Sequence, residues 1–295
     1  MKQKRKYYSA YEDRYRRVYA QGVEYWTNDP IEIKDMIDKL NRFLECYKLL
    51  PKDTKIIEFG CGEGHLAQYL VETGYKYLGV DLSPSAIKKA KERIGNINAN
   101  KYFLLGDITH LDGIPDESYD VGIDNQCLQM LIVDDDRRNY LSEIARILVK
   151  RGKAYYHEIY QEDVFEGEIK TFDEYIKKFN LDLETLEDRE IFTKGQYQKI
   201  KLPPVPARFN NEIGYRKELV NAGFMIDNFY VDAQKCVIYA IKNRISCTSA
   251  NKAYLASCLR HFAQIPRFAR NFRYAQPLDA IEFAKFEYEK GGMVL

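Results

Sequence analysis

Three glycines and two acids stand close together in the stretch KIIEFGCGEG, residues 55–64. Glycine occupies every second position at Gly60, Gly62 and Gly64, and Glu58 lies two residues before the first of them. Glycines at a strand-to-helix turn let the backbone approach a ligand closely, and the first amides of the following helix offer unpaired donors. We therefore expect a ligand site at this turn.

Two common phosphate-binding patterns do not fit the spacing of these glycines. A dinucleotide fingerprint, G-x-G-x-x-G, needs a third glycine where this chain has His65, and the P-loop pattern G-x-x-x-x-G-K-S/T is absent from the sequence. The remaining pattern is E-x-G-x-G-x-G. Because a carboxylate at Glu58 would repel pyrophosphate, this pattern suits a ligand that carries positive charge.

The stretch resembles the first motif of the class I S-adenosylmethionine-dependent methyltransferases, whose cofactor carries an ammonium and a sulfonium. In that family an acid at the end of the second strand binds both ribose hydroxyls, and Asp81 stands in that place, followed by Leu82. An acid after the third strand meets the adenine amino group, and Asp107 fits that position, with the Ile108 backbone beside the ring.

The resemblance covers about residues 55–242 and includes the run from Arg146 to Gly152 before the fifth strand. It implies S-adenosylmethionine as the cofactor. The cofactor contacts that it implies are Trp26, Glu58, Gly60, Gly62, Asp81, Leu82, Asp107, Ile108 and Asp124.

The segment ahead of the core, YEDRYRRVYAQGVEYWTNDP, is rich in aromatic residues and contains the one tryptophan, Trp26. It resembles the R-Y-x(n)-G-x-x-x-W-x-x-x-P entry of small-molecule methyltransferases that act on thiols and related acceptors, including the thiopurine-like type. That resemblance implies a leader folded over the cofactor, where aromatic faces attract a sulfonium and exclude water. A place for Trp26 in the hydrophobic core is the open alternative.

Methyl transfer needs an acceptor lone pair in line with the methyl–sulfur bond, in a site without competing water. Side chains at the carboxyl ends of the fourth and fifth strands face the methyl group in such a fold. These positions nominate Asn125, Gln126 and Tyr160 as substrate residues and Asp124 and His157 as catalytic residues, with His157 as the general base. A purely structural histidine between tyrosines and an acid is the alternative for His157.

Strand-like and helix-length segments alternate from Lys55 to about Lys242, which predicts a doubly wound α/β fold with helices on both faces of the sheet. A closing pair of strands joined as a hairpin predicts a seven-stranded, mostly parallel sheet with an antiparallel last strand. The predicted strands are 55–60, 75–83, 101–107, 118–126, 152–160 and two within 225–243. The predicted helices are 65–73, 84–94, 137–149 and 211–223.

Three segments lie outside this core: a helical leader at 1–54, an insertion at 161–206 and a tail at 243–295. Residues 158–190 hold twelve acids against four bases, whereas 243–278 hold five arginines and one lysine with no acid. We expect the insertion to form a lid that favours a neutral or cationic acceptor, and the tail to be a basic helical extension. Solvated helical faces are the alternative for both.

The composition is that of an ordinary soluble chain, with a formal net charge of +1 and 45% hydrophobic residues. No apolar run approaches the length of a membrane span. The six cysteines lack the spacing of a zinc site, which indicates reduced thiols that bind no metal. We therefore expect a cytoplasmic protein.

The leading prediction is a methyltransferase that acts on a nitrogen, oxygen or sulfur atom of a small molecule. Nucleic acid is not the expected partner, because the acidic insertion would repel a phosphate backbone. The alternatives are an RNA or protein methyltransferase docking through the basic tail, a non-catalytic cofactor-binding subunit and an aminopropyl transferase. Acceptor identity and oligomeric state stay open.

Overall fold

The computed structural model describes residues 4–95, 98–164 and 167–243. The chain divides into two units, Met1–Ser246 and Cys247–Leu295. Beyond Asn243 the expected helical tail lies outside the described residues, so its prediction is not tested.

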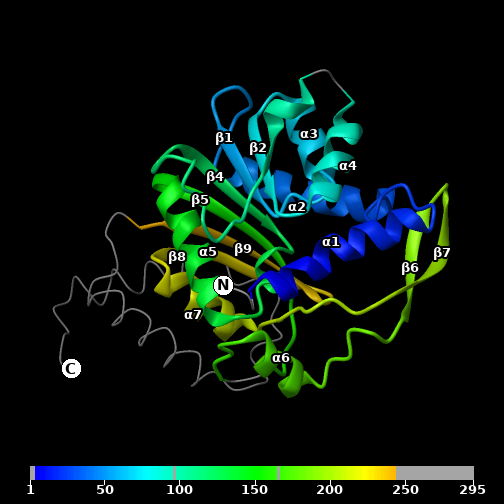
Figure 1. Ribbon diagram of the computed structural model, residues 1–295. Coiled ribbons are helices and arrows are strands. Elements are labelled where there is room, and N and C mark those ends of the chain that lie inside the picture. The colour runs from blue at the N-terminus through cyan, green and yellow to red at the C-terminus, as the bar shows by residue number, and fades with distance from the viewer. Residues whose placement is uncertain (1–3, 96–97, 165–166, 244–295) are drawn as a thin grey trace. The chain divides into compact units, whose positions relative to one another are not determined.

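A seven-stranded sheet forms the centre of the first unit, in the order β3-β2-β1-β4-β5-β9-β8 (Figure 1). Strands β1 to β5 pair in parallel, whereas β9 runs antiparallel to both β5 and β8. This arrangement confirms the predicted mostly parallel sheet with an antiparallel last strand. The strands are β1 Lys55–Phe59, β2 Lys76–Asp81, β3 Phe103–Leu105, β4 Tyr119–Asn125, β5 Leu148–Ile159, β8 Phe224–Asp232 and β9 Lys235–Lys242.

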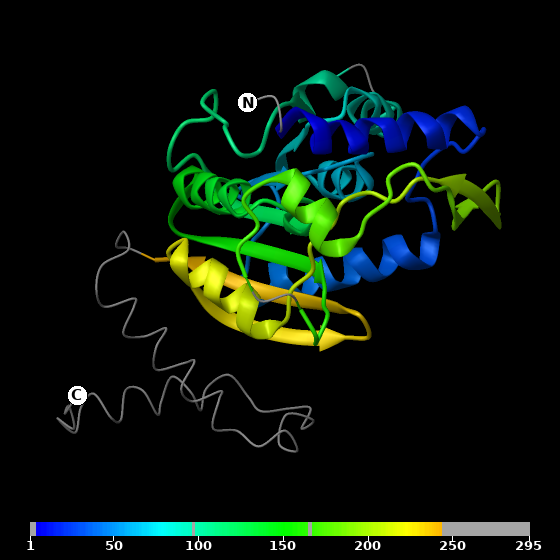
Figure 2. The same ribbon diagram turned by 60° about the horizontal axis from the view of Figure 1, so that its bottom comes forward.

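Alternating side chains of the strands enter two separate cores, one on each face of the sheet. Ile56 and Tyr155 pack with α2, α3 and α4, whereas their neighbours Ile57 and Tyr156 pack with α5, α6 and α7. Figure 2 shows α7 lying along the β8–β9 side of the sheet. No helix among the described residues is long and apolar enough to cross a bilayer. The helices are α1 Lys4–Ala20, α2 Pro30–Cys46, α3 His65–Thr73, α4 Pro84–Ile94, α5 Asp134–Ile147, α6 Phe172–Phe179 and α7 Glu212–Asn221.

Local sequence signals explain where the elements next to the glycine loop begin. The Ser83 side chain accepts a hydrogen bond from the Ala86 N–H and Pro84 is the first residue of α4, as predicted. Gly74 ends α3 in the left-handed conformation. Strand β5 begins at Leu148, four residues earlier than predicted. Its pairing with β4 starts there and continues past Gly152 after a register shift between Tyr119 and Val121.

The leader and the insertion add helices and a second, small sheet to this core. The leader contains α1 and α2, as the sequence predicts. The insertion contains α6 and a hairpin of β6 Glu187–Thr193 and β7 Gln196–Leu202, which the sequence did not predict. Figure 1 shows the hairpin standing beside the C-terminal end of α1. Their contact is a small hydrophobic cluster that includes Val18, Ile191 and Leu202.

Candidate functional site

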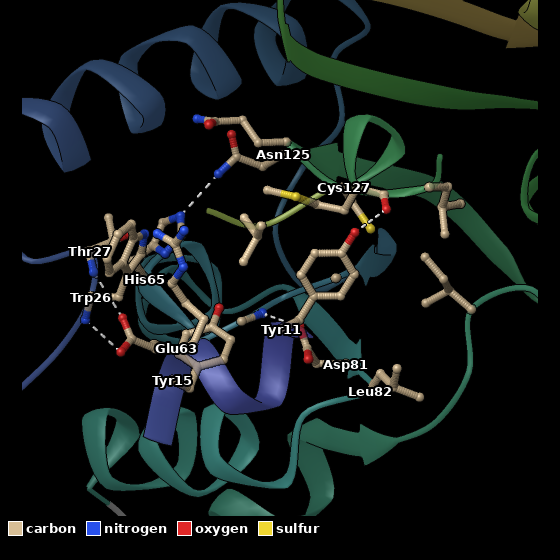
Figure 3. Close-up of a pocket in the computed structure, with 18 of the residues that line it drawn as sticks. Tyr11, Tyr15, Trp26, Thr27, Glu63, His65, Asp81, Leu82, Asn125 and Cys127 are labelled. Carbon is tan, nitrogen blue, oxygen red and sulfur yellow. Dashed lines mark hydrogen bonds between the residues drawn. The ribbon is translucent and has the colours of Figure 1, made fainter. Parts of the chain in front are cut away.

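A cavity of about 420 Å³ lies at the carboxyl ends of β1, β2 and β4, beneath α1 and the leader (Figure 3). The strand order reverses here, because β1 has β2 on one side and β4 on the other. Crevices at such switch points are the usual ligand sites of open α/β sheets. The expected residues that line the cavity are Trp26, Gly60, Gly62, Asp81, Leu82, Asp107, Ile108, Asn125 and Gln126.

The glycine loop after β1 has a backbone that residues with side chains would strain. Gly60, Gly62 and Gly64 have φ angles of +67°, +51° and +71°. A Cβ atom at Gly60 would lie 2.9 Å from the Cβ of Cys127, and one at Gly64 would lie 3.0 Å from the Cβ of Ala90. The loop therefore needs glycine for its conformation and for its close packing.

Two carboxylates face the cavity from the ends of β2 and β3. Asp81 Oδ2 accepts a hydrogen bond from the Gly62 N–H and Oδ1 accepts one from the Ser83 N–H, both at 2.8 Å. Each oxygen keeps a second lone pair, and burial raises the pKa of Asp81. Asp107 Oδ1 accepts from the Thr109 N–H at 2.9 Å. Both carboxylates can therefore accept further hydrogen bonds from hydroxyl or amino groups of a ligand.

Glu58 and Asp124, two more expected site acids, do not line the cavity. Each is 1% exposed. Glu58 accepts a hydrogen bond from the Tyr77 hydroxyl, and burial raises its pKa to about 8. Asp124 accepts from the Cys127 N–H at 2.7 Å and from the Tyr140 hydroxyl at 2.7 Å. Asp124 therefore supports the turn after β4 from inside the protein, whereas Glu58 links β1 to Tyr77 of β2.

His157 on β5 and Tyr160 directly after that strand also lie away from the cavity. His157 is 0% exposed, and its Nδ1 lies 2.8 Å from Oδ1 of Asn125. Burial lowers the pKa of His157 to about 3. Tyr160 packs edge-on against Phe229, with ring centroids 6.5 Å apart. The structure therefore joins His157 to the cavity through Asn125, whereas Tyr160 has no such connection in the described part of the chain.

Helix α1 supplies cavity residues that sequence reasoning missed, including Tyr11, Arg14 and Tyr15. Arg14 is 8% exposed, its guanidinium lies 4.8 Å from the ring centroid of Trp26, and Nη2 donates to the Pro203 carbonyl at 2.9 Å. Its Nε finds no hydrogen-bond partner among the described residues. Their spacing of three and four residues, which places them on one helical face, was the available signal.

Glu63, inside the glycine loop, fastens the leader to the core and was also missed. Its carboxylate is 2% exposed and accepts hydrogen bonds from the Tyr19 hydroxyl at 2.8 Å, the Trp26 N–H at 2.7 Å and the Thr27 N–H at 3.0 Å. Arg93 adds a bond from Nη2 to the Thr27 carbonyl at 2.9 Å. Figure 3 shows Glu63 turned toward the backbone of the leader. Trp26 thus lies in the cavity wall and also packs on the hydrophobic cluster of the hairpin.

The insertion contributes Glu190, Ile191 and Val205 to the wall of the cavity. Glu32 from α2 is a second carboxylate in the wall, paired with Lys235 at 3.1 Å. Other acids of the insertion lie elsewhere, as Glu168 does beside Arg138 at 3.5 Å. The acidic character of the insertion therefore reaches the cavity through Glu190.

The donors and acceptors around the cavity fit S-adenosylmethionine. Asp81 and Asp107 offer acceptors for ribose hydroxyls and an adenine amino group, and the buried Nε–H of Arg14 offers a donor for a carboxylate. Among the described residues, no group of three His, Cys, Asp or Glu side chains could hold a metal ion.

Residues 57–156 match the family model of a methyltransferase domain, Methyltransf_11. The eEF1A lysine and N-terminal methyltransferase homolog of Drosophila pseudoobscura pseudoobscura is 30% identical over 140 residues, which are 45% of this chain and 20% of that protein. The malonyl-[acyl-carrier protein] O-methyltransferase of Hamiltonella defensa is 33% identical over 101 residues, 34% of this chain and 36% of that protein. The match thus spans about a fifth of the first relative and about a third of the second.

Solved structures show the same fold at low sequence identity. A SAM-dependent methyltransferase of Methanosarcina mazei has a TM-score of 0.51 at 20% identity, and the match covers 68% of this chain and 97% of that one. The [4+2]-cyclase SpnF has a TM-score of 0.50 at 15% identity, with 74% and 86% covered. Since a cyclase shares the fold, the fold alone does not assign the reaction. The region that matches, residues 57–156, is therefore a methyltransferase domain by sequence, and S-adenosylmethionine is the cofactor that its cavity fits.

Proposed function

We propose that this chain transfers a methyl group to a nitrogen, oxygen or sulfur atom of a small molecule by direct in-line displacement. The observation that carries the proposal is the cavity of about 420 Å³, which combines the glycine loop, two carboxylates and a buried guanidinium under a closed leader. Its volume lies in the range of small-ligand pockets, roughly 300–1,000 Å³. Bound S-adenosylmethionine supplies the methyl group, on a positively charged sulfur.

The chain itself binds, orients and excludes water. Asp81 and Leu82 would hold the ribose, Asp107 and Ile108 the adenine, and Arg14 the carboxylate of the amino-acid part. The leader, fastened by Glu63, covers the site, which strengthens electrostatic contacts inside it and keeps water from the methyl group. Catalysis in this proposal comes mainly from positioning.

The acceptor enters the part of the cavity lined by Trp26, Asn125, Gln126 and Glu190. Gln126 holds a φ of +64°, an uncommon conformation for a residue with a side chain, and such strain clusters at functional sites. The place of Glu190 in the cavity wall is evidence for the proposal that the insertion acts as a lid. Its negative charge favours a neutral or cationic acceptor. The pattern of the leader supports a thiol or a related small acceptor. The cysteines without zinc spacing support a cytoplasmic location.

A protein acceptor is the second candidate. The relatives that match first are named as eEF1A lysine and N-terminal methyltransferases, and a lysine side chain is slender enough to enter a cavity of this size. The basic tail of 243–278 could then dock on the partner protein. The malonyl-[acyl-carrier protein] O-methyltransferase is named for a different acceptor, a malonyl group on a carrier protein, so the relatives do not agree on one acceptor class.

Isotope labelling separates these candidates. The protein is incubated with methyl-deuterated S-adenosylmethionine and, in parallel, with a metabolite extract and a protein extract, and products are analysed by mass spectrometry. A labelled small molecule, absent with the Asp81→Ala variant, supports the leading proposal. Label in a protein supports the second candidate, and cofactor binding without any labelled product would leave a non-catalytic subunit.

A further inference from the structure

Three polar side chains form a connected row from the cavity into the interior. His65 is the first residue of α3, Asn125 is the last residue of β4, and His157 is its register partner on β5. His65 Nε2 lies 3.0 Å from Asn125 Nδ2, and Asn125 Oδ1 lies 2.8 Å from His157 Nδ1. Figure 3 shows the contact between His65 and Asn125 in the cavity wall.

Both histidines of the row are neutral at physiological pH. Burial is the main cause, and it lowers the pKa of His65 and of His157 to about 3. A neutral imidazole has one nitrogen that donates and one that accepts. Each histidine in the row can therefore exist in two tautomers, and its neighbour decides which one is present.

Asn125 fixes the direction of the whole row. Its Nδ2 lies 3.2 Å from the sulfur of Met36, which has no proton and can only accept, so the amide nitrogen faces Met36 and His65. His65 Nε2 then accepts a hydrogen bond from Asn125, and the His65 proton resides on Nδ1. The amide oxygen faces the other way and accepts from the Nδ1–H of His157.

This direction leaves an unpaired, enclosed donor on a residue of the cavity wall. His65 lines the cavity, and its Nδ1 is buried without a hydrogen-bond partner among the described residues. An unpaired buried donor costs roughly 1–3 kcal/mol, which a ligand acceptor would recover. His157 Nε2 is likewise unpartnered, but His157 is 0% exposed and reaches the ligand only through Asn125.

We propose that His65 donates a hydrogen bond from Nδ1 to an oxygen atom of the bound ligand, and that Asn125 and His157 are positioning residues that hold His65 in this tautomer. The inference rests on the proposed function and adds the ligand group that the row recognises, a carboxylate or carbonyl oxygen. Two ligands can bring such an oxygen: the amino-acid part of the cofactor, or the acceptor molecule. His157 is then a positioning residue and not the general base.

The test uses two substitutions of His157, which does not touch the ligand. His157→Leu removes the N–H that holds the Asn125 oxygen, whereas His157→Gln keeps an N–H donor there. Nitrogen-15 NMR of the four histidines, assigned with a His65→Phe variant, reports the tautomer of His65. We expect the Nδ1–H tautomer in the wild type and in His157→Gln, and a mixture in His157→Leu. A wild-type His65 protonated at Nε2 would overturn the inference.

Calorimetry and turnover identify the source of the oxygen. S-adenosylhomocysteine carries the amino-acid carboxylate, and 5′-methylthioadenosine lacks it. A loss of about tenfold in affinity for the first ligand alone in His157→Leu, restored in His157→Gln, assigns the oxygen to the cofactor. Unchanged affinity for both, with a KM about tenfold higher for the acceptor found by labelling, assigns it to the acceptor.

Two results oppose the inference in different ways. If His157→Leu changes neither nucleoside affinity nor acceptor KM, the row plays no part in ligand recognition. If the wild-type protein binds neither nucleoside, the proposed function fails and the ligand of His65 fails with it. The NMR spectrum separates the two cases, because the tautomer of His65 is measured without any ligand.

Discussion

The acids around the glycine loop differ in what donates to them, and this difference assigns their roles. Asp81 accepts backbone hydrogen bonds on both oxygens but still faces the cavity. Glu58 and Asp124 are buried beside tyrosine hydroxyls and stand outside the cavity wall. A carboxylate that still faces the cavity can bind a ligand, whereas one enclosed by protein donors holds neighbouring segments in place.

Replacing Asp81 by Ala should weaken the binding of S-adenosylhomocysteine at least tenfold. The substitution removes two acceptors for ribose hydroxyls, and a hydrogen bond to a charged group is worth roughly 1.5–3 kcal/mol. Isothermal calorimetry measures the affinity. Asp53→Ala, in the exposed turn before β1 and at the end of that strand opposite the cavity, is the control and should bind like the wild type. Equal affinities for both variants would place the ribose elsewhere.

Glu58 should make the protein less stable as the pH rises. Its pKa is about 8 in the folded protein and about 4.5 ordinarily, so over this range the folded state holds a proton that the unfolded state has lost. The free energy of unfolding therefore falls between pH 4.5 and 8, by on the order of 4 kcal/mol from this group. Glu58→Gln should remove this decline and be more stable than the wild type at pH 8.

Urea denaturation at pH 5 and pH 8 measures that difference. Several other buried carboxyls titrate in the same sense, so the informative quantity is the change between variant and wild type. Glu72→Gln, an exposed carboxyl on α3, is the matched control and should leave the pH profile unchanged. A Glu58→Gln profile that runs parallel to the wild type would show that Glu58 is ionised in the folded protein.

Among single residues, the sequence predicts those whose backbone position alone decides their role. Asp81 and Asp107 follow strands at the edge of the crevice, and both line the cavity as expected. Asp124 and Asn125 are adjacent on β4 and face opposite sides of the sheet, so the sequence could not say which one reaches the cavity. His157 shares the face of Asn125 but lies deeper, under α2, and only the packing of that helix decides its burial.

At the scale of elements, the leader is part of the site because several side chains attach it to the core. Glu12 of α1 accepts hydrogen bonds from the hydroxyls of Ser83 and Ser85 at 2.6 Å each, directly after Asp81. Glu63 accepts one more from Tyr19 of α1 and two from the backbone of Trp26 and Thr27 in the segment after it. A ligand in the cavity is therefore enclosed by the leader, and leaving requires some of these bonds to open.

Replacing Glu63 by Gln should speed the dissociation of S-adenosylhomocysteine about tenfold. Gln has the same shape, but its NH₂ group accepts no hydrogen bond, so at least one donor of the leader would be left without an acceptor. Stopped-flow fluorescence of Trp26 measures the rate. The control is Glu24→Gln, an exposed carboxyl of the same segment. A wild-type rate in Glu63→Gln would mean that ligand release does not depend on this attachment.

The sequence predicts the core elements better than the added ones. Apolar runs identify all seven strands of the main sheet, because the central strands are buried on both faces and the edge strands β3 and β8 are still rich in apolar residues. The β6–β7 hairpin is rich in charge and mostly exposed, so its strands resemble a solvated loop in sequence. Ile191 and Leu202 are buried in a cluster with Val18 of α1 and with Val23 and Trp26 after it, far earlier in the chain, and no local pattern contains these contacts.

At the scale of the whole molecule, charge is distributed unevenly along the chain. The acids of 158–190 and the bases of 243–278 nearly cancel in the net charge of +1. Among the described residues of the insertion, Glu168, Glu187 and Asp188 form surface ion pairs, as Asp188 does with Lys201 at 2.9 Å. The field at the cavity therefore depends on the few carboxylates in its wall and less on the total charge of the insertion.

Replacing Glu190 by Lys should raise the KM for a cationic acceptor several-fold at low salt and much less at high salt. A carboxylate at the cavity wall attracts a positive charge within a Debye length of about 8–10 Å, and a lysine repels it. The acceptor is the one identified by labelling, and initial rates are measured at low and high ionic strength. For a neutral acceptor we expect the same KM in the variant and the wild type.

Glu168→Lys makes the same change of charge on the same insertion but at a residue outside the cavity wall. If proximity to the cavity decides the effect, Glu168→Lys should leave the KM and its salt dependence as in the wild type. If both variants raise the KM equally, the field of the whole insertion governs approach, as the sequence alone suggests. If neither variant affects a cationic acceptor, the insertion encloses the site without selecting charge, and the acceptor is chosen by contacts such as those of His65 and Asn125.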